Sequence, residues 1–114
     1  MRMHAVGGLC NRLRAIVSYH DKHPDLTVVW HVDEPVAHAR FLDVFKPIPG
    51  VTFTESGSWD EESFGWYKSA KDGRYGPLEA RMMRCIKPTD DIFRRLSDLS
   101  IVKPYAAVHV RKTP

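Results

Sequence analysis

Two polar clusters, one near each end of the sequence, carry the residue types that bind anions. Near the start, "GGLCNR" places Gly7 and Gly8 just before Asn11 and Arg12. Adjacent glycines let the backbone turn tightly, and a helix that begins there offers unpaired N–H groups to an anion. Near the other end, "HVRK" supplies His109, Arg111 and Lys112. An arginine holds phosphate oxygens with a fork of donors, so both clusters favour a phosphate-containing ligand.

Each cluster also has a simpler explanation. "GGLCNR" has neither the G-x-G-x-x-G spacing of dinucleotide sites nor that of a Walker A loop, and a short motif of this kind is often only a strand-to-helix turn. Asn11 and Arg12 favour ligand binding, because a turn alone needs neither an amide nor a guanidinium. Arg111 and Lys112 would otherwise be solvated charges after a strand. His109 fits an orienting, hydrogen-bonded residue better than a catalytic base.

Alternating strand and helix patterns surround these clusters. Runs rich in β-branched and aromatic residues predict strands at Arg2–Val6, Leu26–Val32, Val51–Thr54 and Tyr105–Val110. Helical spacing of Leu9, Leu13, Ile16 and Val17 predicts a helix that ends before Pro24, and further helices are predicted at Val36–Phe45, at Leu78–Ile86 and after the N-cap Thr89. The segment Ser56–Pro77 shows no period and is predicted to be a long loop, with Asp60, Glu61 and Glu62 as a solvated acidic patch.

This alternation predicts an α/β fold. We expect one Rossmann-like domain over residues 1–114, with a parallel sheet of order 3-2-1-4 and helices on both faces. In that order the first strand and Tyr105–Val110 are neighbours at the topological switch, and such sheets bind ligands there, at the carboxyl ends of the strands. "GGLCNR" and "HVRK" directly follow these two strands, so the two clusters are predicted to form one site.

Composition narrows the class of protein. With 43% hydrophobic residues and a net charge of +3, the chain fits a globular domain and suits an anionic ligand without demanding nucleic acid. Basic residues that lie among acids, without interleaved aromatics, leave nucleic-acid binding a minor alternative; these are Arg81, Arg84, Arg94 and Arg95. No apolar run reaches the roughly 20 residues of a membrane helix, and no signal peptide precedes the first strand, which predicts a cytoplasmic protein.

The cysteines and histidines give no metal motif. Cys10 and Cys85 lack C-x-x-C spacing and are predicted to be reduced thiols. His20 and His23 form an H-x-x-H pair that has no evident third ligand. These spacings predict no metal site, and no cofactor is expected.

Three segments resemble the fucosyltransferase superfamily, which includes α1,6-, α1,2- and protein O-fucosyltransferases. "GGLCNRLRAI" is similar to the superfamily's GGLGNR-L-RA opening, and "FLDVFKPIPGV" is similar to a segment of the type F-x-D-(L/V)-F. "KPTDDIFRRLSDL" followed by "YAAVHVRKT" resembles the helix and the strand that carry the H-x-R-R-x-D motif. The three segments occur in the superfamily's order and across the whole chain.

The resemblance implies the N-terminal half of a GT-B fold, with the second, donor-binding domain absent from this chain. It also implies metal-independent transfer of fucose from GDP-fucose to a glycan or protein acceptor. Arg111 matches the arginine that binds the donor's diphosphate and helps the nucleotide depart, and His109 matches the histidine placed against the nucleotide. The remaining matched positions line the same cleft; they are Gly7, Gly8, Asn11, Arg12 and Lys112. Cys10, Lys112 and Pro114 stand where the motifs have glycine, arginine and aspartate.

Two functions from different classes follow. The first is a fucosyltransferase-like glycosyltransferase that becomes active only when a second domain completes it, because that domain supplies most of the guanosine site in the superfamily. The second is a catalytically inactive α/β module for protein interaction, which Pro114 and the missing domain favour. In the first case, the face that a second domain would cover is predicted to remain partly apolar and to promote association.

Overall fold

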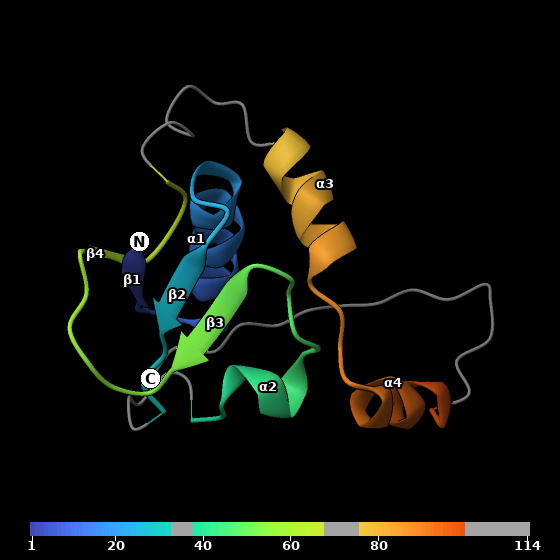
Figure 1. Ribbon diagram of the computed structural model, residues 1–114. Coiled ribbons are helices and arrows are strands. Elements are labelled where there is room, and N and C mark those ends of the chain that lie inside the picture. The colour runs from blue at the N-terminus through green and yellow to red at the C-terminus, as the bar shows by residue number, and fades with distance from the viewer. Residues whose placement is uncertain (33–37, 68–75, 100–114) are drawn as a thin grey trace, which may run out of the picture.

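The computed structural model describes residues 1–32, 38–67 and 76–99 (Figure 1). The strands are β1 Arg2–Ala5, β2 Leu26–Val29, β3 Val51–Thr54 and β4 Glu61–Ser63. The helices are α1 Leu9–Lys22, α2 Phe41–Val44, α3 Gly76–Cys85 and α4 Asp90–Ser97. No helix in these ranges combines the length and the apolar character needed to cross a lipid bilayer.

The four strands form one parallel sheet in the order β3-β2-β1-β4. This confirms the predicted α/β class and the order 3-2-1-4. The fourth strand, however, is Glu61–Ser63, which pairs with Met3–Ala5 and lies inside the segment predicted to be a loop. That part of the loop prediction is wrong, and β4 occupies the place beside β1 that was predicted for Tyr105–Val110. Tyr105–Val110 itself lies outside the described residues.

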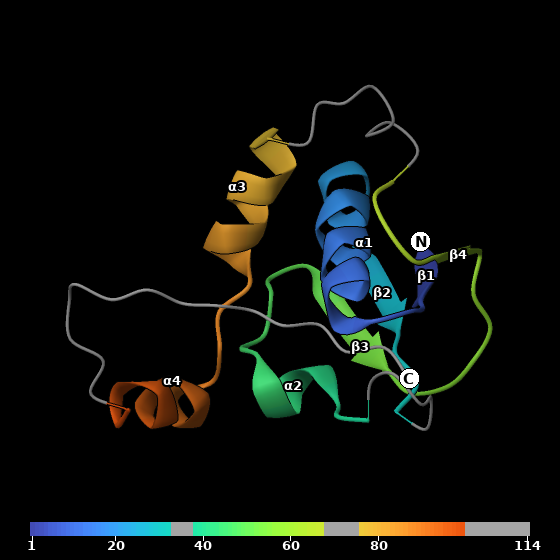
Figure 2. The ribbon, with the colours of Figure 1, turned by 180° about the vertical axis from the view of Figure 1, so that it is seen from behind.

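One face of the sheet carries the hydrophobic core. Alternation along β1 and β2 puts Met3, Val28 and Trp30 on this face, where they pack against α1. Helix α1 lies directly against the strands, with α3 beside it (Figure 2). Phe41 of α2 stacks on Phe53 of β3 with ring centroids 4.1 Å apart, so α2 closes the same face at the β3 side. Helices α1 and α2 therefore cover the same side of the sheet.

The opposite face is covered near β1 by the connection between β3 and β4, residues 55–60. The Trp59 ring lies 4.2 Å from the His4 ring, and Arg2 Nε donates to the Ser58 carbonyl at 2.7 Å. The chain passes from β1 to β3 in one direction along the sheet and returns to β4 in the other. A right-handed crossover then requires the second connection to use the opposite face. The sequence predicted helices on both faces, but beside β1 this short segment without helix or strand covers the second face.

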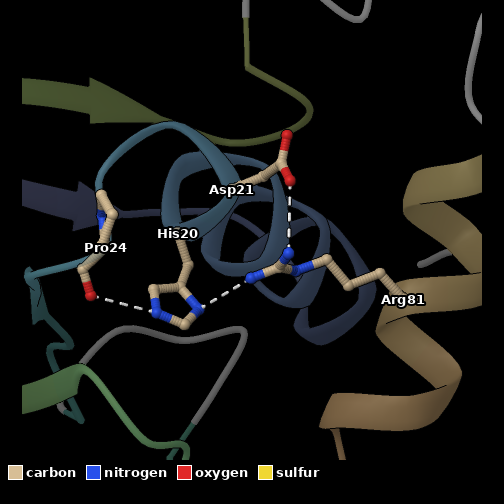
Figure 3. Close-up of polar contacts among 4 residues, drawn as sticks. All are labelled: His20, Asp21, Pro24 and Arg81. Carbon is tan, nitrogen blue, oxygen red and sulfur yellow. Dashed lines mark hydrogen bonds and ion pairs between the residues drawn. The ribbon is translucent and has the colours of Figure 1, made fainter.

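Helix α3 is held against α1 by the Arg81 side chain (Figure 3). Arg81 Nη1 donates to Asp21 Oδ1 at 3.2 Å, and Nη2 lies 3.3 Å from His20 Nδ1. Because Arg81 can only donate, His20 Nδ1 accepts, and its Nε2–H then donates to the Pro24 carbonyl at 3.2 Å. Arg81 is one of the four arginines considered above for nucleic-acid binding, and in the structure it holds α1 and α3 together.

Helix α4 begins as predicted, with the Thr89 hydroxyl accepting a hydrogen bond from the Ile92 amide at 3.4 Å. The segment before it is tied to α2 by the Thr89 amide, which donates to the Val44 carbonyl at 2.9 Å. None of the helix residues is buried. Phe93 and Leu96 of α4, and Leu99 just beyond it, are 63%, 57% and 62% exposed.

The contact between α1 and β4 predicts a pH-dependent stability. The Tyr19 hydroxyl donates to Glu61 Oε2 at 2.8 Å, and burial together with this carboxylate raises the pKa of Tyr19 to about 12. In the unfolded chain tyrosine titrates near pH 10. The unfolded state therefore loses its proton first, and the contribution present below pH 10 is lost as pH rises towards 12.

We expect the Tyr19→Phe variant to be less stable than the parent protein by about 1 kcal/mol near neutral pH, because one hydrogen bond is lost. The difference in free energy of unfolding between the two proteins should become smaller above about pH 10. Urea unfolding of both proteins across this range, followed by circular dichroism, measures the difference. Curves that stay parallel throughout would show that Tyr19 titrates normally in the folded protein.

Candidate functional site

The Gly7–Gly8 turn connects β1 to α1 at the carboxyl edge of the sheet. Gly7 has a φ of +89°, a backbone conformation that residues other than glycine rarely adopt. A Cβ placed on Gly7 would lie 3.2 Å from the Cβ of Phe64, the residue that follows β4. The turn is therefore held between the ends of β1 and β4, which is the topological switch of this sheet.

The N-terminus of α1 is open at Gly8. This residue is the N-cap in an extended conformation, with no side chain capping the helix and no acid in the first turn. A Cβ added to Gly8 would meet no atom within 4 Å. The amides of the first helical turn have no partner within the helix and carry a partial positive charge, so this open end suits an anion.

A hollow of about 400 Å³ lies at the carboxyl end of β4, and one of its lining residues, Phe64, is the neighbour that a Cβ on Gly7 would meet. Its lining residues are Glu62, Ser63, Phe64, Gly65 and Trp66. Two aromatic residues and one acidic residue thus line this hollow, and Phe64 is 67% exposed. Flat rings at the edge of a hollow suit stacking with a base or a sugar ring.

Asn11 and Arg14 lie on the first two turns of α1, next to this hollow. Arg14 Nη1 donates to Asn11 Oδ1 at 3.1 Å, and the Arg14 guanidinium carbon is 6.0 Å from the centre of the Trp66 ring. The structure therefore brings the predicted residue Asn11 to the site together with a cation that the prediction missed. The signal was present in the sequence, because residues three apart on a helix share a face.

Arg12 supports the turn from inside the protein. Its side chain is fully buried, Nε donates to the Gly7 carbonyl at 2.8 Å, and Nη1 donates to the His31 carbonyl at 3.1 Å. The guanidinium also lies over the Trp30 ring, 4.8 Å from its centre. It thereby ties the carboxyl ends of β1 and β2 together. The structure places Arg12 at the predicted edge as a positioning residue for the turn.

The acidic residues of the β4 region are held by protein contacts. Glu61 accepts a hydrogen bond from the Tyr19 hydroxyl. Glu62 Oε2 accepts from His4 Nδ1 at 3.1 Å, and Asp60 Oδ2 accepts from the Arg2 amide at 2.9 Å. Asp60 and Glu62 remain exposed, as expected for a solvated patch, whereas Glu61 is half-buried, so that prediction is wrong for Glu61 alone. The partners of the three acids are far away in the sequence and come together only because β4 pairs with β1.

The remaining predicted residues of the site, His109, Arg111 and Lys112, lie outside the described residues. Within the described ranges, no group of three or more histidine, cysteine or acidic side chains could hold a metal ion. Cys10 is exposed at the start of α1, Cys85 is half-buried, and both are free thiols.

The site thus consists of an open helix N-terminus, a glycine turn and an aromatic hollow at the switch between β1 and β4. Chemically, this arrangement suits an anionic group attached to a flat ring. No family model matches this sequence, and no curated protein or solved structure matches the chain.

Proposed function

We propose that this chain binds the diphosphate of a nucleotide sugar at the open N-terminus of α1. The observation that carries the proposal is the unobstructed Gly8 position beside the hollow at the topological switch. The resemblance to fucosyltransferases supports GDP-fucose as the donor. Completed by a second domain, the chain would transfer fucose to a glycan or protein acceptor.

Charge gives the ligand an orientation in this proposal. The α1 amides and Arg14 are the positive groups of the described site, whereas Glu62 is an acid on the wall of the hollow. The phosphates belong next to Gly8, away from Glu62, and a ring of the ligand belongs on Phe64 and Trp66. Arg111 would add a bidentate phosphate contact, and His109 and Lys112 would lie nearby, as the resemblance implies. The free thiols are in keeping with a cytoplasmic location, which is part of the same proposal.

Titration with GDP and with guanosine, followed by amide NMR shifts, tests the proposal. We expect GDP to bind with a Kd of about 1 mM, equivalent to roughly 4 kcal/mol, and guanosine to bind much more weakly. Added salt should weaken GDP binding because the contacts are between exposed charges. Arg111→Ala should abolish binding, and Arg111→Lys should recover part of it. Equal binding of guanosine, or shifts that lie away from residues 7–14, 62–66 and 109–112, would contradict the diphosphate site.

The Gly8→Asp variant separates binding from folding. Aspartate is a slightly better N-cap than glycine, so the free energy of unfolding should rise by a few tenths of a kcal/mol, roughly 0.3 kcal/mol. The same carboxylate would occupy the position proposed for the diphosphate and would repel its negative charge. The affinity for GDP should therefore fall by at least about tenfold. Gly8→Ala is the matched control, since it adds no charge and meets no neighbour. A stable Gly8→Asp protein that binds GDP like the parent would disprove binding at α1.

Helix α4 favours a second candidate function, an interaction module without catalytic activity. Phe93 and Leu96 of this helix, together with Leu99 just beyond its end, are exposed apolar residues and offer a surface of the kind that binds other proteins. Concentration-dependent sedimentation of the parent and of a Leu96→Glu variant tests this function. Association that the glutamate abolishes would support the module, and a monomer at every concentration would count against it.

A further inference from the structure

A second hollow lies at the carboxyl ends of β2 and β3, on the other side of β1 from the hollow at β4. It encloses about 360 Å³, within the range of small-molecule sites. Its lining residues are Trp30, Arg40, Phe41, Leu42, Phe53, Thr54 and Glu55. None of these residues belongs to the proposed diphosphate site.

The floor of this hollow is aromatic and held in place. Trp30 and Phe41 are only 3% and 2% exposed, with ring centroids 5.7 Å apart in an edge-to-face arrangement. Trp30 Nε1 donates to the Ala39 carbonyl at 2.8 Å, which fixes the indole. Phe41 in turn stacks on Phe53. Such a preformed apolar surface suits an apolar side chain and gives no partner to a charged group.

The rim of the hollow carries one charge of each sign. Arg40, the residue before α2, forms an ion pair through Nε with Glu55, the residue after β3. The two side chains are 67% and 47% exposed. An ion pair this exposed contributes little to stability, so a ligand can exchange its partners at little cost.

We propose that this hollow binds a free α-amino acid with an aromatic side chain. The ring would occupy the floor formed by Trp30, Phe41 and Phe53. The ligand's carboxylate would form an ion pair with Arg40, and its ammonium group would form one with Glu55. Both protein charges would then keep a partner of opposite sign. A ligand with only one of these charges leaves the other rim residue without its original partner. This inference is independent of the proposed diphosphate site.

Titration of the full chain with L-phenylalanine, 3-phenylpropionate and phenethylamine tests the inference. We expect saturable NMR shifts of the Trp30 indole N–H and of the Thr54 and Glu55 amides. Phenylalanine should bind at least about fivefold more tightly than either single-charge analogue, because only the zwitterion satisfies both rim residues. Phenylpropionate or phenethylamine binding as tightly as phenylalanine would overturn the zwitterion site, as would the absence of saturable shifts at these residues.

Charge-neutral variants locate the contacts. Arg40→Gln and Glu55→Gln should each lower phenylalanine affinity by about fivefold. Glu55→Gln should in addition remove the preference over phenylpropionate, since the ammonium group loses its partner. Asp43→Asn is the matched control, an exposed acid on α2 that does not line the hollow, and it should bind phenylalanine like the parent. Equal losses in all three variants would show a non-specific charge effect and overturn the assignment.

Discussion

Replacing Arg12 by methionine is expected to lower the free energy of unfolding by about 3 kcal/mol. Methionine keeps the apolar stem but removes the donors to the Gly7 and His31 carbonyls, which lie at the ends of β1 and β2. Hydrogen bonds from a charged group contribute about 1.5–3 kcal/mol each, and both of these bonds are part-buried. For a domain stabilised by roughly 5–15 kcal/mol, this is a large share, and the Tm should fall by about 10 °C.

Urea unfolding of the variant, followed by far-UV circular dichroism, measures this loss. Arg14→Met is the matched control, because Arg14 lies on the same helix and is only half-buried. Its bond to Asn11 is local, so the control should lose no more than about 1 kcal/mol. Equal stabilities of the two variants would mean that Arg12 does not hold the strand ends together.

Replacing Gly50 by alanine is expected to destabilise the protein by about 2–4 kcal/mol. Gly50 precedes β3 with a φ of +83°, and its carbonyl accepts the Leu26 amide at the start of β2. An added Cβ would lie 2.5 Å from the Pro24 carbonyl oxygen and 2.8 Å from His20 Nε2. These two groups bond to each other at the end of α1 (Figure 3), so neither can move freely.

Thermal unfolding of Gly50→Ala measures the cost, and hydrogen exchange of the Leu26 amide reports on the local pairing. Gly8→Ala is the control, because Gly8 has a φ of −69° and open space around it. It should change stability by no more than about 0.5 kcal/mol. A Gly50→Ala protein as stable as the Gly8→Ala protein would show that the turn before β3 can rearrange.

Several elements were predictable because their signals are local. The strand Val51–Thr54 has the predicted bounds, α1 ends before Pro24 as predicted, and α4 begins directly after Thr89. Thr89 caps α4 as predicted, since a cap depends only on the next three residues. The sheet order followed from the alternation of strands and helices with right-handed crossovers. The glycine turn was correctly placed at the end of β1.

The site needed more than local signals. Among the apolar positions used to predict α1, Ile16 and Val17 are buried, whereas Leu9 is 42% exposed. The buried stripe instead starts at Arg12, three and four residues before Ala15 and Ile16. Which of the two arginines in "NRLRA" faces the sheet depends on how α1 docks, and that orientation made Arg12 a buried support and Arg14 the cation beside Trp66.

The sequence by itself determined the elements with strong periodicity, the glycine turn, the cap of α4 and the parallel order of the sheet. Only the tertiary structure decided the fourth strand, because "EES" has weak strand propensity and is held by pairing with β1 and by contacts of Glu61 with Tyr19 and Glu62 with His4. It also decided which side chains surround the hollow at the ends of β2 and β3. Local patterns reflect interactions within a few residues, whereas the contacts of Glu61 with Tyr19 and of Glu62 with His4 join residues more than forty positions apart.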